Sequence, residues 1–283
     1  MYQTYAMTHS STDAGRPAAF FDLDGTLIPG SANIPLAKTA FKAGMVGKRE
    51  LLRDLRNGAS FLLSGASDAR SAQVRDRILF AVQGHPASQV EALGDVFLPD
   101  LVASLRPQLE PVLAEHAARG EDRIVLSASP TEIVSRFAEG AGLTYGRGTT
   151  AGRDADGVYD GTLVGPFCYQ DGKVEIMAEM AAEHGYDLSR SYAYTDSASD
   201  LPMLEAVGNP VVVHPEPELR AIAEERGWPI IETSSVPRTS LRSFRGITGL
   251  AGNAISAVAT KASGAAKFAV SRARRRSAPH SAT

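Results

Sequence analysis

The 283-residue chain contains a single cysteine, Cys168, and the lack of a second thiol excludes an internal disulfide framework. Such a chain suits a reducing compartment, so we expect a cytoplasmic protein. A lone cysteine beside Phe167 is more typical of a small core residue than of a reactive thiol. No run of about eighteen apolar residues occurs either, so the sequence offers no candidate membrane-spanning helix.

Acidic residues are absent from the end of the chain. No Asp or Glu follows Glu232, whereas nine basic residues do, namely Arg238, Arg242, Arg245, Lys261, Lys267, Arg272, Arg274, Arg275 and Arg276. Taking these nine charges away from the formal net charge of −3 leaves residues 1–232 at −12. An acidic body that carries a basic tail predicts different partners for the two parts.

The tail, residues 235–283, also has its own spacing of apolar residues. Small and apolar side chains recur at steps of three and four from Phe244 to Ala269, which predicts an amphipathic helix ending in RARRR. Such a helix can lie on anionic lipid, and we predict peripheral membrane contact through residues 240–276. A solvated, partly disordered tail is the alternative. Nucleic-acid binding ranks third, because no aromatic platform accompanies RARRR.

Short apolar runs and helical patterns alternate along the body. The runs cover residues 18–23, 123–126, 192–194 and 210–213, with 229–231 as a fifth candidate. The helical patterns cover 107–119, 131–140, 173–183, 201–206 and 218–226. Strands that alternate with helices predict βαβ units and a parallel sheet. The polar residues 1–16 contain no apolar signal core, so they are predicted to be a disordered lead-in to a domain over 17–234.

Two stretches interrupt this alternation. About a hundred residues separate the first two strands, far more than a crossover needs, and their helical pattern predicts a helical module inserted at about residues 31–99. Residues 148–166 are rich in Gly, Asp and Thr, which predicts a β-hairpin or a bulged excursion. Asp154, Asp156 and Asp160 could belong to a calcium loop there, but they lack the EF-hand spacing, so a solvated hairpin is preferred.

The stretch FFDLDGTLIPG places two carboxylates at the end of the first strand. Asp22 and Asp24 are two residues apart and therefore leave an extended chain on the same side. Gly25 permits a tight turn next to them. Two neighbouring carboxylates stay ionised together when a cation lies between them, and hard oxygen ligands suit Mg²⁺. The alternative is a polar turn that merely closes a strand.

Three further stretches are ambiguous when taken singly. Ser127 in RIVLSASP ends a strand and could bind a phosphoryl oxygen, although serine at such a junction is usually a helix cap. Lys173 in DGKVEIM opens a helix, where a cation is disfavoured unless it faces an anion; a solvated surface lysine is the alternative. Asp196 and Asp200 in AYTDSASDLPML can either cap backbone groups or complete a metal site.

Taken together and in this order, DLDGT, a strand-end serine, a lysine and DxxxD resemble the haloacid dehalogenase (HAD) superfamily over about residues 17–232. YTDSASDLPML is similar to the fourth motif of its phosphoserine-phosphatase-like branch, subfamily IB. The resemblance implies a Rossmann-like parallel sheet with helices on both faces. It also implies that the insertion after the first motif is a helical C1-type cap.

The resemblance implies a role for each matching residue. Asp22 is the expected nucleophile, which becomes a phosphoaspartate, and Asp24 the expected acid and base, whose backbone carbonyl also binds Mg²⁺. Asp196 is then the second carboxylate ligand, and Asp200 supports it or shares that role.

The phosphate site is implied in the same way. Ser127, with Ala128 beside it, and Lys173 are expected to hold the phosphoryl oxygens. Gly25 and Thr26 are expected to shape and position the loop after the nucleophile.

Two departures from that branch weigh against phosphoserine as the substrate. The Glu expected nine residues after the nucleophile, which binds the substrate's amino group, is Ser31 here. The usual Ser-Gly-Gly of the second motif is Ser127-Ala128-Ser129.

The resulting hypothesis is a Mg²⁺-dependent phosphomonoesterase for a small phosphorylated metabolite or lipid headgroup. Its alternatives are a phosphoserine phosphatase and a membrane-tethered scaffold with a vestigial site. A haloacid dehalogenase ranks below these, because such enzymes need neither Asp24 nor a metal.

Overall fold

The computed structural model describes residues 15–42, 72, 75–76, 78–79 and 82–233. The predicted tail and the middle of the predicted insertion lie outside the described residues, as do residues 1–14 of the predicted lead-in. Gly15 and Arg16 are described, although the sequence placed them in that lead-in. The Arg16 guanidinium lies 2.6 Å from Asp122, and its backbone N–H donates to Gly185.

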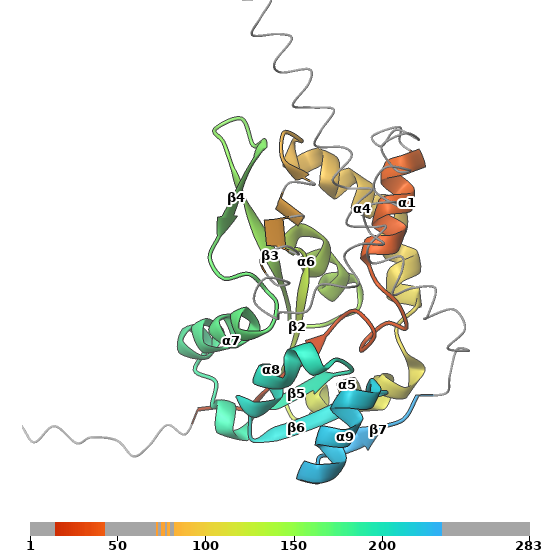
Figure 1. The fold of residues 1–283 in the computed structure, drawn as a ribbon, viewed down its shortest axis with the longest axis vertical. Coiled ribbons are helices and arrows are strands. Elements are labelled where there is room, and N and C mark those ends of the chain that lie inside the picture. The colour runs from red at the N-terminus through yellow and green to blue at the C-terminus, as the bar shows by residue number, and fades with distance from the viewer. Residues whose placement is uncertain (1–14, 43–71, 73–74, 77, 80–81, 234–283) are drawn as a thin grey trace, which may run out of the picture.

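A seven-stranded sheet forms the centre of the described part, in the order β4-β3-β2-β1-β5-β6-β7 (Figure 1). Its strands are β1 (Ala18–Asp22), β2 (Asp122–Pro130), β3 (Tyr145–Arg153), β4 (Tyr159–Val164), β5 (Tyr192–Thr195), β6 (Asn209–Val213) and β7 (Ile230–Ile231). All neighbours pair in parallel except β3 and β4, which are antiparallel. The predicted parallel sheet is confirmed.

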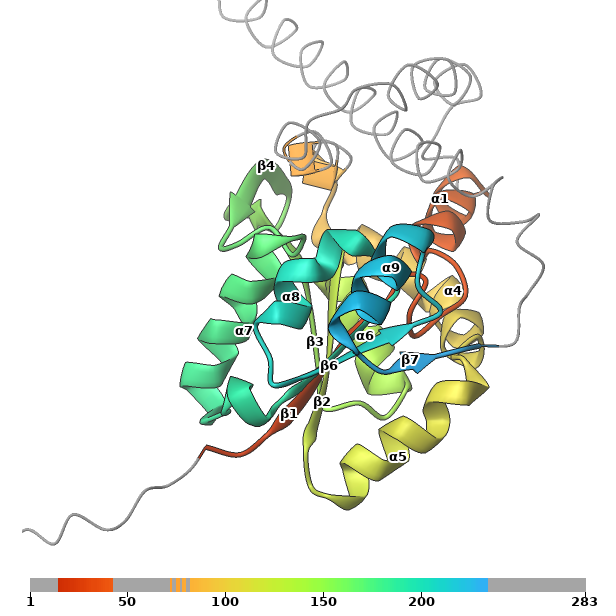
Figure 2. The same ribbon diagram turned by 60° about the horizontal axis from the view of Figure 1, so that its bottom comes forward.

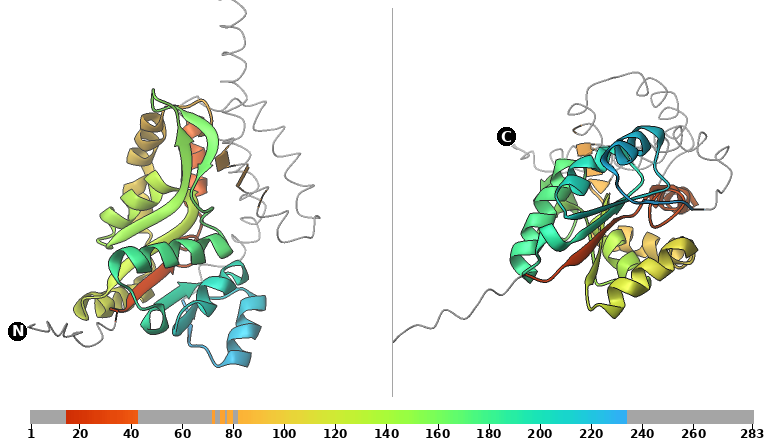
Figure 3. Two further views of the ribbon diagram at one scale, coloured as in Figure 1. Left: turned by 90° about the vertical axis from the view of Figure 1, so that its left-hand side faces the viewer. Right: turned by 90° about the horizontal axis from the view of Figure 1, so that it is seen from below.

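Helices cover both faces of this sheet, as Figure 2 and the right-hand view of Figure 3 show. The β1 side chains alternate: Ala19 and Phe21 face one layer, and Ala18 and Phe20 face the other. The first layer contains α4 (Ala87–Ala103), η1 (Pro107–Leu109), α5 (Glu110–Ala118) and α6 (Thr131–Gly140). The second contains α7 (Asp171–His184), α8 (Leu201–Glu205) and α9 (Pro217–Arg226). Both phenylalanines are fully buried, which stabilises the fold by roughly 1.5–3 kcal/mol each.

The described parts of the predicted insertion are helical. The helix α1 (Asn33–Lys42) opens it, residues 72, 75–76, 78–79 and 82 are also helical, and α4 follows. The sequence placed the end of the insertion at about residue 99, but α4 continues through Pro99 to Ala103. It does so because Phe97, Leu98 and Leu101 pack into the core layer beside α6.

The predicted hairpin is present as β3 and β4, with a register shift between Ala151 and Arg153. It also holds the part of the insertion that directly precedes α4. The backbone N–H of Gly84 donates to the Tyr159 carbonyl over 2.8 Å, and that of Tyr159 donates to the His85 carbonyl over 3.0 Å. Asp154 accepts backbone hydrogen bonds from residues 156 and 158, so this acidic residue builds the turn.

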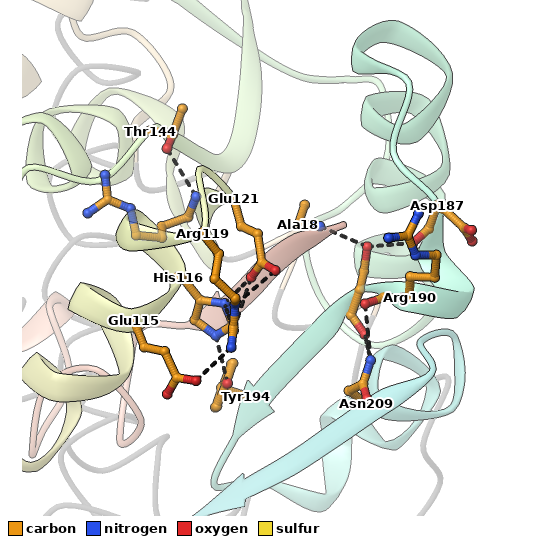
Figure 4. Close-up of polar contacts among 12 residues, drawn as sticks. Ala18, Glu115, His116, Arg119, Glu121, Thr144, Asp187, Arg190, Tyr194 and Asn209 are labelled. Atoms are coloured by element: carbon orange, nitrogen blue, oxygen red, sulfur yellow. Dashed lines mark hydrogen bonds and ion pairs between the residues drawn. The ribbon is translucent and has the colours of Figure 1, made fainter. Parts of the chain in front are cut away.

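A buried polar network joins α5 to β5 (Figure 4). The two ring nitrogens of His116 lie 2.5 Å from the Glu121 carboxylate and 2.8 Å from the Tyr194 hydroxyl. Arg119 holds the other Glu121 oxygen over 3.0 Å. Burial lowers the pKa of His116 despite its hydrogen bond to Glu121. His116 therefore has a structural role in its neutral form.

Candidate active site at the carboxyl ends of the central strands

Three neighbouring strands bring the predicted residues to one edge of the sheet. Asp22 is the last residue of β1, Asp196 directly follows β5, and Ser127 lies in β2 next to Leu126, the residue paired with Asp22. In the sheet, β1 lies between β2 on one side and β5 on the other, and the chain adds β2 and β3 on the first side before it returns to add β5 on the second. Open α/β sheets bind ligands beside such a switch point, at the carboxyl ends of the strands.

Lys173, on the first turn of α7, is buried and turned toward two carboxylates. Its Nζ donates to Asp22 Oδ1 over 2.6 Å and to Asp200 Oδ2 over 2.8 Å. Burial alone would lower the pKa of this lysine, but Asp200 and Asp22 outweigh burial and raise it. This lysine in the first turn of a helix thus faces two anions. The alternative that the sequence left open, a solvated surface lysine, is wrong.

The carboxylates around Lys173 raise one another's pKa values. Burial, followed by the charges of Asp200 and Asp24, raises the pKa of Asp22 to about 7 even though Lys173 opposes this. Burial raises the pKa of Asp24 to about 6. Burial and the nearby Asp22 also raise the pKa of Asp196 well above its usual range. One lysine therefore does not neutralise the negative charge of this cluster.

The loop after Asp22 is fitted closely to Asp196. Thr26 Oγ1 donates to Asp196 Oδ1 over 3.0 Å and accepts from the Asp196 backbone N–H over 2.9 Å. Gly25 has a φ of +87°, and a Cβ atom at this position would lie 2.2 Å from Asp196 Oδ2. The glycine is thus required by the backbone conformation and by the carboxylate behind it.

Asp24 is held by the first residues of the insertion. Its Oδ1 accepts the backbone N–H of Ala32 over 2.7 Å, and the hydroxyl of Ser31 also helps to hold its pKa down. The backbone N–H of Gly25 donates to the Gly30 carbonyl over 2.9 Å, which closes the loop. Ser31 is therefore a neighbour of Asp24 and brings no charge of its own.

The sequence predicted that β2 ends at Ser127, but the strand continues to Pro130, with an irregular register from residue 126 onward. Ser127 Oγ accepts the backbone N–H of Ser129 over 3.1 Å, so its own proton remains available to an anion. Thr149 Oγ1 donates to the Ala128 carbonyl over 2.8 Å and fixes this turn. Irregular strand ends of this kind re-aim side chains beside active sites.

Several supporting residues carry no pattern in the sequence. Arg106 is buried and donates to the Gly25 carbonyl over 2.9 Å and to Thr233 Oγ1 over 2.8 Å. Thr195 Oγ1 donates to Asp200 Oδ2 over 2.8 Å. Cys168 is fully buried, with a pKa raised to about 12 chiefly by burial, near Lys173. The one sequence signal at Arg106 is the proline that follows it, which is typical of a helix start. That signal does not identify the partners of Arg106, which are distant in sequence.

The donor set fits a small divalent cation. Among the described residues, no three acidic, histidine or cysteine side chains are close enough together to hold a metal by themselves. Mg²⁺ does not need such a cage, because it keeps several waters and binds one or two protein carboxylates. Asp22 and Asp196 repel each other in a buried site, as the raised pKa of Asp196 shows, and this repulsion is what a bound cation relieves. Asp200 instead lies against Lys173 and Thr195.

The comparison of sequences decides the family. A model of the haloacid dehalogenase-like hydrolases matches residues 19–205. The chain belongs to that family. As a member of it, with relatives named as phosphatases, the chain is a phosphatase.

Two relatives and one solved structure illustrate the membership in the HAD family. A probable phosphatase of Mycobacterium tuberculosis is 39% identical over 77% of this chain and 76% of its own. A phosphoserine phosphatase of the same species is 32% identical over 75% of this chain and 70% of its own. A Bordetella pertussis protein of unknown function is 29% identical, has a TM-score of 0.66, and is matched over 77% of this chain and 98% of its own. Within the described residues of this HAD phosphatase, no helix is long and apolar enough to cross a bilayer.

Proposed function

We propose that this phosphatase hydrolyses small phosphomonoesters through a phosphoaspartate at Asp22 and depends on Mg²⁺. The observation that carries the proposal is the buried contact of Lys173 Nζ with Asp22 Oδ1 over 2.6 Å, in a cluster with more carboxylates than cations. Lysine orients the nucleophile and can also bind a phosphoryl oxygen. Catalysis of phosphoryl transfer consists mainly of such positioning and charge stabilisation.

In the first step, an oxygen of the Asp22 carboxylate attacks phosphorus, and the bond from phosphorus to the ester oxygen breaks. The departing alkoxide takes a proton from Asp24, so that an alcohol leaves. A pKa of about 6 for Asp24 keeps roughly a tenth of it protonated at pH 7, compared with well under 1% for an ordinary aspartate. The Ala32 N–H holds this carboxylate in place for the transfer.

In the second step, Asp24, now ionised, accepts a proton from a water molecule, whose oxygen attacks the phosphoaspartate. The bond between phosphorus and the Asp22 oxygen breaks, which releases inorganic phosphate and restores the carboxylate. Covalent capture thus divides one difficult hydrolysis into two easier displacements.

The phosphoryl oxygens are proposed to lie between Lys173 and the Ser127 hydroxyl, whose proton is not used by the neighbouring backbone. Asp22, Asp196 and the backbone carbonyl of Asp24 would hold Mg²⁺, with Asp200 in support through Lys173. When bound, the ion neutralises charge that develops on the phosphoryl oxygens.

The substrate is proposed to be a small phosphorylated metabolite or a lipid headgroup. Phosphoserine is the second candidate, because one relative at 32% identity is named a phosphoserine phosphatase. Against it stands Ser31, an uncharged neighbour of Asp24 where that branch of the family has an amine-binding glutamate.

The test is phosphate release from a panel of phosphomonoesters with Mg²⁺ and with EDTA, for the wild type and for Asp22→Asn. We expect metal-dependent release that falls by about 10³-fold or more in the variant, because the nucleophile is lost. Asp156→Asn, on the exposed hairpin, is the matched control and should behave as the wild type. Unchanged turnover in Asp22→Asn would refute the mechanism, and a folded wild type with no turnover of any ester would favour the scaffold hypothesis.

A further inference from the structure

Arg106 is a buried cation that takes no part in the chemistry described above. It lies in the segment between α4 and η1, and only 7% of its surface is exposed. Its Nε is also buried and has no hydrogen-bond partner among the described residues. A buried charge with an unpaired N–H group costs free energy, and apolar residues of similar size fill a core at lower cost. The arginine therefore needs an explanation other than packing.

The backbone of Arg106 is held firmly in place. Pro107 follows it and confines it to an extended conformation, in which it has a φ of −64° and a ψ of 119°. Its N–H donates to the Leu27 carbonyl over 2.8 Å, and its carbonyl accepts the Leu109 N–H over 2.9 Å. The side chain thus starts from a fixed backbone that is already attached to the loop after Asp22.

The guanidinium of Arg106 joins two segments that are far apart in the sequence. Its Nη2 donates to the Gly25 carbonyl over 2.9 Å, and its Nη1 donates to Thr233 Oγ1 over 2.8 Å. Thr233 is buried and follows β7, the last strand at that edge of the sheet. Arg106 therefore contacts the loop at both Gly25 and Leu27, and its side chain ties the first of these contacts to the segment after β7.

Thr26 lies in the chain between the two residues that Arg106 holds. Its hydroxyl donates to Asp196 Oδ1 over 3.0 Å and accepts the Asp196 backbone N–H over 2.9 Å. The charge of Arg106 is also felt at this carboxylate: burial lowers the pKa of Arg106, and the nearby Asp196 partly offsets that effect. The position of Asp196 thus depends on Thr26, and the position of Thr26 depends on the contacts that Arg106 makes on either side of it.

We propose that Arg106 is a positioning residue of this phosphatase: through residues 25–27 it holds Asp196 where that carboxylate binds Mg²⁺. The proposal rests on the proposed function, because Asp196 is a ligand of the proposed ion. Two separate N–H groups are needed, since Gly25 and Thr233 belong to different parts of the chain. Arginine supplies them in a planar fork, whereas the ammonium of lysine carries the same charge without that geometry. Replacing residues that orient metal ligands in this way lowers metal affinity by about 10- to 100-fold.

The test measures the Kd of Mg²⁺ by calorimetric titration of the purified full chain with MgCl₂ alone. For Arg106→Lys we expect a Kd about tenfold or more above that of the wild type, because the charge remains but the two partners cannot both be reached. Thr233→Val removes one partner, leaves every charge in place and lies outside the site, so we expect a smaller rise in the same direction. A wild-type Kd in either variant overturns the proposal.

Ser104→Ala is the matched control, because it separates this role from a general loss of stability. Ser104 lies in the same segment as Arg106, and its hydroxyl donates to the Leu101 carbonyl over 2.7 Å. The control should have a Tm lower by up to a few degrees but bind Mg²⁺ with the Kd of the wild type. A Kd that rises as much in the control as in the two variants would make general destabilisation the cause, and that result also overturns the proposal.

Phosphate release from the ester panel gives a second readout. Both variants should have a higher apparent KM for Mg²⁺, and saturating Mg²⁺ should restore most of kcat, because the substitutions weaken binding of the ion and leave Asp22 and Asp24 in place. A wild type that neither binds Mg²⁺ nor hydrolyses any ester refutes the proposed function. A wild type that does both, beside variants with an unchanged Kd, refutes only the role of Arg106.

Discussion

Gly25 is a residue at which a single added methyl group should affect both the stability and the activity of the protein. Its φ of +87° and the Asp196 carboxylate, 2.2 Å from where a Cβ atom would lie, both exclude a side chain. For Gly25→Ala we expect a free energy of unfolding lower by about 1–3 kcal/mol. We also expect phosphatase activity to fall at least tenfold, because Asp196 must move. Urea unfolding and the release of phosphate measure the two effects.

Gly157→Ala is the matched control for this prediction. Gly157 has a φ of +74° in the hairpin turn, but nothing lies within 4 Å of the added atom. The control should therefore lose about 1–2 kcal/mol through backbone strain alone and keep its activity. If Gly25→Ala retains full activity, the close fit between Gly25 and Asp196 has no catalytic importance.

At the same scale, the sequence identified groups with distinctive chemistry and missed groups with ordinary chemistry. Lys173 could be interpreted because an early helical cation needs anions, and the structure supplies Asp22 and Asp200. Arg106 and Thr195 left no such signal. Each completes a hydrogen bond to the site, but arginine and threonine are common elsewhere, and only the fold brings Arg106 next to Gly25.

At the scale of elements, periodicity predicted the existence and order of the strands better than their ends. The apolar run that becomes β2 stops at residue 126, yet the strand continues through Ser127 to Pro130 because backbone pairing resumes after the irregular turn. A proline marked the expected end of the insertion, yet α4 continues past Pro99 because tertiary packing of Phe97 and Leu101 outweighs a helix breaker. The local sequence shows neither the strand with which β2 pairs nor the core layer against which α4 packs.

The network between α5 and β5 predicts a pH dependence of stability. The lowered pKa of His116 keeps the ring neutral in the folded protein, while the unfolded chain takes up a proton below about pH 6.5. The stabilisation is therefore complete above the unfolded pKa and is lost as the pH falls toward the folded one. The slope is limited to about 1.4 kcal/mol per pH unit for one proton. Urea unfolding between pH 8 and about pH 5 measures it.

His116→Gln serves as the comparison, since glutamine keeps hydrogen-bonding atoms but does not titrate. The buried carboxylates near Lys173 also titrate with folding, yet they contribute equally to both proteins and cancel in the difference. Burial lowers the pKa of His116, and Glu121 opposes this effect. The sign of the difference between the two pH profiles therefore shows which of the two effects is larger. Parallel profiles for the two proteins would contradict a neutral buried histidine.

At the scale of the whole molecule, the fold gathers charge from distant parts of the chain. Asp22 and Asp200 come from the ends of different βα units, and Lys173 from a helix on one face of the sheet. The family resemblance implied this meeting, because it assigns all three residues to one site. The sequence could not predict the loop that leads into α7, because Gln170 there has a φ of +49° although it is not a glycine.

The concentration of carboxylates predicts that Mg²⁺ stabilises the whole fold. Desolvation and mutual repulsion raise the pKa of Asp22 and of Asp196, so a cation that binds only the folded state relieves an existing cost. At a concentration about 100 times its Kd, such a ligand adds about 2.7 kcal/mol. That is roughly 5–10 °C in Tm for a domain of this size. Thermal unfolding with MgCl₂ and with EDTA measures the shift.

The pH dependence and the variants make this prediction specific to the site. Protons compete with the ion for Asp22, whose pKa is about 7, so the Mg²⁺-dependent shift in Tm should shrink as the pH falls below that value. Asp196→Asn should abolish most of the shift, because it removes one of the two side-chain ligands. Asp156→Asn in the hairpin, where the side chain is exposed, should keep the shift in full. An equal shift in both variants would place the cation elsewhere, because binding would then not depend on Asp196.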